Sequence, residues 1–175
     1  MRRLTDDGAV FLVGFMGTGK TLVGTHLARA LDWNLVDTDA SIEESEGRSI
    51  ETIFAEDGEG YFRKTEWKAL VRAAEASRVV VATGGGAYLG AGQRALIRRA
   101  GPSVWLDVPL EILRTRLGPG RGRPLWMPDD PVGLRAMFER RRATYALADH
   151  RVNASGGTPR EIAERILDKL RPPNL

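Results

Sequence analysis

The stretch GFMGTGKT, residues 14–21, decides the fold of this chain. It matches G-x-x-x-x-G-K-[ST] at every fixed position, with an apolar run before it and apolar residues at helical spacing after it. In this context the glycines allow backbone N–H groups to face phosphates at the positive end of a helix. The pattern therefore predicts a nucleoside triphosphate site built by Gly14, Met16, Gly17, Thr18, Gly19, Lys20 and Thr21.

The last two residues of the motif have separate expected roles. The Lys20 ammonium is expected to reach the β- and γ-phosphates, and the Thr21 hydroxyl is expected to bind Mg²⁺. The structural alternative is a glycine-rich turn with a chance lysine, and the flanking strand and helix argue against it. The motif predicts a phosphoryl donor and leaves the acceptor open.

Beyond this loop, short apolar runs alternate with segments of helical spacing. The runs are 9–14, 33–39, 78–86, 103–108 and 150–155, and the helical segments are 20–32, 41–76, 92–101, 109–117, 132–148 and 158–170. The apolar runs are continuous, which favours parallel strands covered on both faces. We expect a single α/β domain over residues 1–175, with helices on both sides of a parallel sheet.

Three unusual sequences follow strands of this expected sheet, at the edge where ligands gather. Besides the phosphate loop they are DTD, residues 37–39, and GGG, residues 84–86. Side chains alternate along a strand, so Asp37 and Asp39 are expected to point the same way. One can sit near Mg²⁺ and the other can accept a hydroxyl proton. The alternative is a polar strand exit in which Asp39 or Ser41 caps the next helix.

Glycines and arginines supply two further candidates. The GGG stretch allows close backbone approach and offers N–H donors, although a plain tight turn has the same composition. The segment GPGRGRPLW places Arg121 and Arg123 where a mobile arginine can stabilise a transferring phosphoryl group. A solvated surface loop is the alternative there.

Composition excludes several classes of protein. The chain has 175 residues and a net charge of +3, but its arginines are spread out without an aromatic–basic repeat, so we expect no nucleic-acid partner. It has no apolar run long enough to cross a membrane and no signal-peptide pattern. The absence of cysteine suits a reducing cytoplasm. A GTPase would need Asn-Lys-x-Asp, which is absent, and DGEG at residues 57–60 is interpreted as a loop between helices.

Taken together, these motifs resemble the shikimate kinase family from about Val10 to Leu170. The resemblance rests on GFMGTGKTLVG, DTDASIE, GRSIETIFAEDGEGYFRKTE, GGGAY, RGRPL and RRATY, in that order. It implies a nucleoside monophosphate kinase-like fold, with a five-stranded sheet in the order 2-3-1-4-5 and a mobile lid over about residues 117–130. It also implies transfer of the γ-phosphoryl group of ATP to the 3-hydroxyl of shikimate, with Mg²⁺, in aromatic amino-acid biosynthesis by a cytoplasmic monomer.

The resemblance also implies roles for particular residues. Asp39 is similar to the aspartate that binds the shikimate hydroxyls and takes the proton, and Asp37 to its partner near Mg²⁺. The acceptor is expected to lie over the helical region of about residues 40–70. Its expected contacts are Phe54, Phe62, Arg63, Gly84, Gly85, Gly86 and Arg141, with Glu66 orienting Arg63. Arg116 is similar to the arginine on adenine, and Arg123 to the lid arginine on the phosphates.

The chain departs from the family pattern at two places. Ala143 stands where the motif Arg-x-Pro-x-Tyr has proline, so Arg141 is chosen among Arg140–Arg142 by its spacing to Tyr145. The loop at residues 153–159 has no basic residue for adenine. The nearest rival is a gluconate kinase, which usually has Asp-Gly-Asp and histidine after the second strand. A nucleoside monophosphate kinase and a non-catalytic ATP-binding module are more distant alternatives.

Overall fold

A computed structural model describes residues 7–118 and 124–170 of the chain. Within these ranges, parallel strands form one five-stranded sheet in the order β2-β3-β1-β4-β5. The strands are β1 (Ala9–Val13), β2 (Asn34–Asp37), β3 (Val79–Ala82), β4 (Ser103–Asp107) and β5 (His150–Asn153). The predicted fold class and strand order are confirmed.

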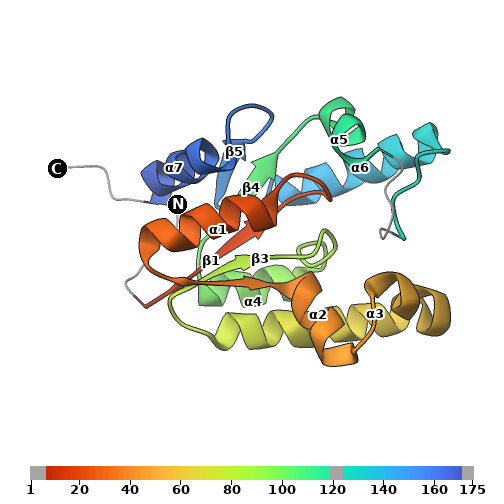
Figure 1. The fold of residues 1–175 in the computed structure, drawn as a ribbon, viewed down its shortest axis with the longest axis horizontal. Helices are drawn as coiled ribbons and strands as arrows, with labels where there is room; N and C mark the ends of the chain where they lie inside the picture. The colour runs from red at the N-terminus through yellow and green to blue at the C-terminus, as the bar shows by residue number, and fades with distance from the viewer. Residues whose placement is uncertain (1–6, 119–123, 171–175) are drawn as a thin grey trace.

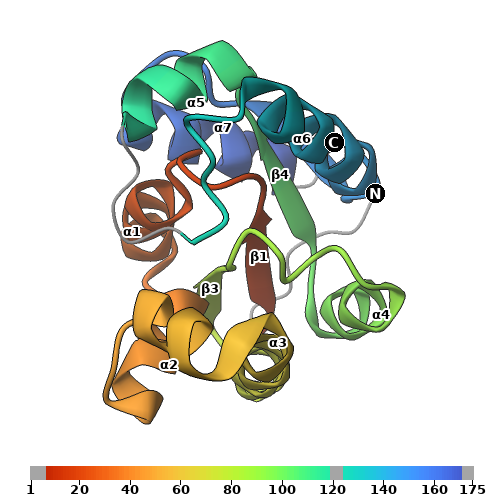
Figure 2. The same cartoon turned by 90° about the vertical axis from the view of Figure 1, so that its right-hand side faces the viewer.

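Helices cover both faces of the sheet (Figure 1). They are α1 (Lys20–Leu31), α2 (Thr38–Glu46), α3 (Ile50–Glu75), α4 (Ala91–Ala100), α5 (Leu110–Leu117), α6 (Pro131–Tyr145) and α7 (Pro159–Leu170). α1 packs beside α7 on one face, and α3 packs beside α4 on the other (Figure 2). The carboxyl ends of the strands point toward the side where α2, α5 and α6 lie (Figure 1).

The core follows the position of each strand in the sheet. The central strands β1 and β3 are buried along their whole length, as continuous apolar sequences predict. The edge strands differ from that prediction. β2 is only partly buried, and in β5 the buried His150 and Val152 alternate with the exposed Arg151 and Asn153. An edge strand has a neighbour on one side only, so fewer of its side chains are covered.

The predicted break between two helices at residues 57–60 is present, but it is a kink at one residue and not a loop. Two helical stretches within α3 (Ile50–Glu75) meet at Gly58, the single non-helical residue (φ 77°, ψ 174°). A positive φ is strained for residues with a Cβ, so glycine allows the kink at this position. The kink turns the first part of α3 back so that Phe54 reaches Phe62, with ring centroids 4.7 Å apart.

A capping box begins α7. The Thr158 N–H donates to the Glu161 carboxylate at 2.7 Å, and the Glu161 N–H donates to the Thr158 hydroxyl at 3.3 Å. Pro159 is the first residue of the helix. None of the helices in the described ranges is long and apolar enough to cross a membrane.

Candidate active site

The phosphate-binding loop joins β1 to the amino end of α1. Gly14 and Gly17 have φ values of 144° and 79°, and a Cβ on Gly17 would lie 2.9 Å from the Leu117 side chain. Glycine is therefore needed at both positions. The Lys20 ammonium donates to the carbonyl oxygens of Gly14 and Phe15 at 3.0 and 2.9 Å, which places its charge within the loop.

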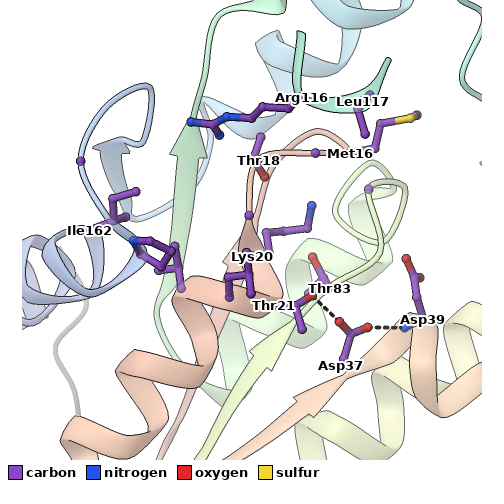
Figure 3. A pocket seen from close by; sticks show the side chains of 17 residues that line it. Met16, Thr18, Lys20, Thr21, Asp37, Asp39, Thr83, Arg116, Leu117 and Ile162 are labelled. Carbon is purple, nitrogen blue, oxygen red and sulfur yellow. Dashed lines mark hydrogen bonds between the residues drawn. The ribbon is translucent and has the colours of Figure 1, made fainter. Parts of the chain in front are cut away.

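A cavity of about 580 Å³ lies in front of this loop (Figure 3). Every predicted nucleotide-site residue in the described ranges lines it, apart from Gly14, which lies at the base of the loop. Several lining residues were not predicted. Gly157, Pro159 and Ile162 lie in the loop before α7 and at its amino end, and Leu22, Val23 and Thr83 lie next to predicted stretches. The Arg116 guanidinium faces this end and donates to the carbonyl oxygens of Ala154 and Ser155 at 3.1 and 3.4 Å.

Thr21 and Asp37 meet beside Lys20. The Thr21 hydroxyl donates to Asp37 Oδ2 at 2.5 Å (Figure 3). The other carboxylate oxygen of Asp37 accepts the N–H groups of Asp39 and Ala40 at 3.0 and 3.2 Å, so Asp37 is the N-cap of α2. The prediction that Asp39 continues the strand of Asp37 is wrong, because this cap ends β2 and places Asp39 in the first helical turn. Both side chains nevertheless line the same cavity.

Asp39 lines the large cavity from that helical turn. Its Oδ1 is buried and has no hydrogen-bond partner in the described part of the chain. Burial of the carboxyl group raises its pKa to about 6, and the nearby Lys20 ammonium limits the rise. Asp39 therefore remains mainly ionised at neutral pH and has a free acceptor oxygen.

A second, smaller cavity adjoins the first between the kinked helix α3 and α6. Asp39, Met16 and Gly85 line both cavities, so the two meet at the Asp39 carboxylate. The remaining lining residues of the second cavity are Ile50, Phe54, Phe62, Arg63, Glu66, Gly86, Pro124, Leu125 and Arg141. Its wall thus combines two aromatic rings with two guanidinium groups.

Acidic side chains orient Arg63. Its Nη1 donates to Glu66 at 2.8 Å, and its Nε and Nη2 donate to Glu59 at 3.1 and 2.8 Å. Glu66 is buried, and burial raises its pKa. The predicted pairing of Glu66 with Arg63 is present in the structure.

Among the three consecutive arginines, Arg141 is the one that lines the cavity. It is buried, with its guanidinium over the Phe15 ring, and burial lowers its pKa. Arg140 is exposed, and Arg142 lies over Trp105 with its Nε 3.7 Å from Asp107. The helical spacing to Tyr145 therefore selected the residue that faces the cavity.

The GGG stretch, residues 84–86, allows close packing. None of the three glycines has a positive φ. A Cβ on Gly84 would lie 2.5 Å from Asp39 Oδ1 and 2.9 Å from Glu66 Oε1, and a Cβ on Gly86 would overlap the Arg63 guanidinium. Gly84 lies behind the site and donates its N–H to Thr38 Oγ1 at 2.8 Å. Charged side chains thus press against Gly84 and Gly86, whereas a Cβ on Gly85 would make only ordinary contacts.

Part of the predicted lid falls outside the described residues. Arg121 and Arg123 lie in the range 119–123, which is not described. Within the described part of residues 117–130, Leu117 lines the larger cavity, and Pro124 and Leu125 line the smaller one.

Comparisons with known proteins show the family of the chain. Residues 16–171 match the family model described as shikimate kinase. A shikimate kinase of Moorella thermoacetica is 40% identical over 94% of this chain and 95% of its own length. The structure of a shikimate kinase from Acinetobacter baumannii in complex with shikimate matches with a TM-score of 0.89 at 34% identity, covering 93% of this chain and 92% of that one.

The rival kinase is more distant. The structure of a gluconokinase from Sinorhizobium meliloti matches with a TM-score of 0.56 at 19% identity, covering 97% of this chain and 93% of that one. At this identity the likeness extends to the fold alone. The family model and the relative at 40% identity cover nearly the whole chain, and the chain therefore belongs to the shikimate kinase family.

Proposed function

We propose that this protein transfers the γ-phosphoryl group of ATP to the 3-hydroxyl of shikimate, giving shikimate 3-phosphate and ADP in aromatic amino-acid biosynthesis. One observation carries the proposal within the site. The Asp39 carboxylate, with an unpartnered buried oxygen, lies where the phosphate-loop cavity meets a cavity bordered by Arg63 and Arg141. An acceptor that has both hydroxyls and a carboxylate matches this arrangement.

The smaller cavity is assigned to shikimate. Arg63 and Arg141 bind its carboxylate, since planar guanidinium groups match carboxylate geometry. Phe54 and Phe62 border the shikimate ring. Gly85 and Gly86 offer backbone N–H groups to shikimate. Gly84, which has no side chain, leaves room for the Asp39 carboxylate. The helical region of about residues 40–70 thus serves as the acceptor-binding part of a single domain over residues 1–175.

The larger cavity is assigned to ATP. The loop at residues 14–19 and Lys20 hold the phosphates, and Arg116 lies on the side of Pro159 and Ile162, where the adenine binds. The apolar surface of Pro159 and Ile162 replaces the basic residue that residues 153–159 lack.

The Thr21–Asp37 pair fits a Mg²⁺ site. A hydroxyl and a carboxylate at 2.5 Å are hard oxygen ligands beside the phosphate loop. The described residues contain no group of three or more His, Asp or Glu side chains that could hold a metal. This suits Mg²⁺, which usually takes one or two protein ligands and completes its shell with phosphate oxygens and water. When bound, Mg²⁺ neutralises phosphate charge.

The residues of the chain then divide the chemistry between them. The 3-hydroxyl oxygen of shikimate attacks the γ-phosphorus, the bond from that phosphorus to the ADP oxygen breaks, and Asp39 receives the hydroxyl proton. Lys20 stabilises the charge on the transferring group. Closure of the segment at about residues 117–130 brings Arg123 to the phosphates and excludes water.

We further propose that the enzyme is a cytoplasmic monomer that binds neither nucleic acid nor membranes.

Product analysis tests this assignment. The protein is incubated with ATP, Mg²⁺ and shikimate, and the phosphorylated position is identified by ³¹P and ¹H NMR. Phosphate on the 3-oxygen is expected, and phosphate on another oxygen would contradict the placement of Asp39.

Arg63→Ala should weaken shikimate binding by about 1.5–3 kcal/mol, the range for hydrogen bonds to charged groups. The control Arg98→Ala, at an exposed position on α4, should leave shikimate binding unchanged.

A further inference from the structure

Tyr145, at the carboxyl end of α6, lies behind the acceptor cavity and does not line it. Its side chain is 2% exposed and packs on Trp105, with ring centroids 6.4 Å apart. Its hydroxyl donates to the carbonyl oxygen of Gly85 at 2.5 Å. Burial raises the pKa of this hydroxyl, so it keeps the proton that the hydrogen bond requires.

The hydrogen bond fixes one peptide plane of the GGG stretch. The carbonyl of Gly85 and the N–H of Gly86 belong to the same trans peptide, so they point in opposite directions. Holding the carbonyl toward Tyr145 therefore directs the Gly86 N–H away from it. Gly85 and Gly86 line the acceptor cavity, and their N–H groups donate to no acceptor in the described ranges.

Arg141 lies one helical turn before Tyr145, and its positive charge limits the rise in the pKa of the Tyr145 hydroxyl. The Arg141 guanidinium also lies beside Gly85, with its Nη1 3.8 Å from the position that a Cβ on that glycine would take. A tyrosine hydroxyl has one proton to donate and can accept at its oxygen, so it can serve Gly85 and Arg141 together. The buried Tyr145 hydroxyl is thus close to both the Gly85–Gly86 peptide and the Arg141 guanidinium, which line the acceptor cavity.

We propose that Tyr145 is a positioning residue, whose hydroxyl holds the Gly86 N–H and the Arg141 guanidinium in register for the carboxylate of the acceptor. This rests on the proposed function, because it requires an acceptor with a carboxylate in the smaller cavity. Tyr145 acts through Gly86 and Arg141 and does not touch the acceptor itself.

The experiment compares Tyr145→Phe with the unaltered protein. The substitution keeps the ring on Trp105 and removes only the hydroxyl. The KM for shikimate should rise roughly 3- to 10-fold, as expected for the loss of a hydrogen bond that aligns charged partners, while the KM for ATP stays within about twofold. With the shikimate analogue that has a hydroxymethyl group in place of the carboxylate, the two proteins should differ by less than about twofold.

Tyr88→Phe is the matched control. Tyr88 is also buried, and its hydroxyl donates to the carbonyl of Leu147 at 3.2 Å instead of to that of Gly85. An equal rise in the shikimate KM for Tyr88→Phe, or an equal penalty for Tyr145→Phe with the hydroxymethyl analogue, would overturn the proposal in favour of a purely structural role. If the unaltered protein fails to turn over shikimate, the proposed function itself fails.

A measurement on the unaltered protein covers the case in which Tyr145→Phe does not fold. The amide resonance of Gly86, assigned by ¹⁵N NMR, should move downfield on addition of shikimate and stay in place on addition of the hydroxymethyl analogue. Unchanged Gly86 resonances at saturating shikimate would contradict the proposal.

Discussion

Arg63 and Gly86 pack so closely that the guanidinium group occupies the space in which a side chain on Gly86 would begin. Arg63 is held in this position by Glu59 and Glu66 on its own helix. The third glycine of the GGG stretch is therefore part of the geometry of the proposed carboxylate site, although its φ lies outside the left-handed region.

A methyl group on Gly86 should displace Arg63. Because the displaced group is the far end of a flexible side chain, we expect Gly86→Ala to fold normally and to raise the shikimate KM about tenfold or more, the loss of a charged hydrogen bond. The KM for ATP should not change. Gly92→Ala, at a helical position with nothing within 4 Å of an added Cβ, is the control. Unaltered kinetics of Gly86→Ala would show that Arg63 does not need this position.

The Asp39 carboxylate should be essential for turnover. Asp39→Asn keeps the size of the side chain and removes the proton acceptor, so kcat should fall by roughly 10²-fold or more, within the range for general-base catalysis. ATP binding, measured by calorimetry without shikimate, should be nearly intact. A large loss of ATP affinity would instead assign Asp39 to the nucleotide site.

Activity should depend on pH through the same group. The pKa of Asp39 is raised to about 6, and the ionised form accepts the proton, so kcat/KM should rise with pH through about 6 and then level off. The profile is measured at constant ionic strength with saturating ATP. A profile that is flat between pH 5 and 8 would contradict the role of Asp39 as the base.

Stability should show the opposite trend with pH. The pKa of Asp39 is about 6 in the folded protein, above the ordinary aspartate value of 3.8, so the folded state holds more protons between about pH 4 and 6. The free energy of unfolding contributed by Asp39 therefore falls as pH rises through this window. Asp39→Asn should be more stable than the unaltered protein by roughly 1–3 kcal/mol at pH 8 and nearly equal to it at pH 4. Denaturant unfolding at both pH values measures the difference in stability between the two proteins. A difference that is the same at pH 4 and pH 8 would show that it does not come from the raised pKa of Asp39.

The magnesium requirement should depend on Asp37. Asp37→Asn keeps the N-cap of α2, since asparagine caps as well as aspartate, and it removes the negative charge beside Thr21. The Mg²⁺ concentration for half-maximal activity should rise by at least the 10- to 100-fold typical of altering an outer-shell partner, because Asp37 is itself a proposed ligand. Circular dichroism should show unchanged helix content. An unaltered Mg²⁺ dependence would move the metal away from this pair.

Much of the fold and site could be predicted from local sequence. The phosphate loop and the apolar runs determine the parallel sheet, because glycine placement and strand–helix alternation are local signals. Tyr145 also identified Arg141 among three arginines, because residues four apart share a helix face.

The errors in prediction arose where local sequence permits two outcomes or where tertiary contacts decide. The end of β2 depended on whether Asp37 or Asp39 caps α2, and the sequence permits both. The part played by Pro159 and Ile162 in the larger cavity depends on how α7 approaches the phosphate loop in space. The capping box Thr158–Glu161 marks the start of this helix, but it carries no information about how close the helix lies to the site.

The most direct test of the proposed acceptor is ADP release from ATP and Mg²⁺, measured with shikimate, with gluconate and with neither. We expect ADP release with shikimate and none above background with gluconate or without an acceptor. Turnover with gluconate, or equal turnover without any acceptor, would contradict the assignment of Asp39, Arg63 and Arg141 to shikimate.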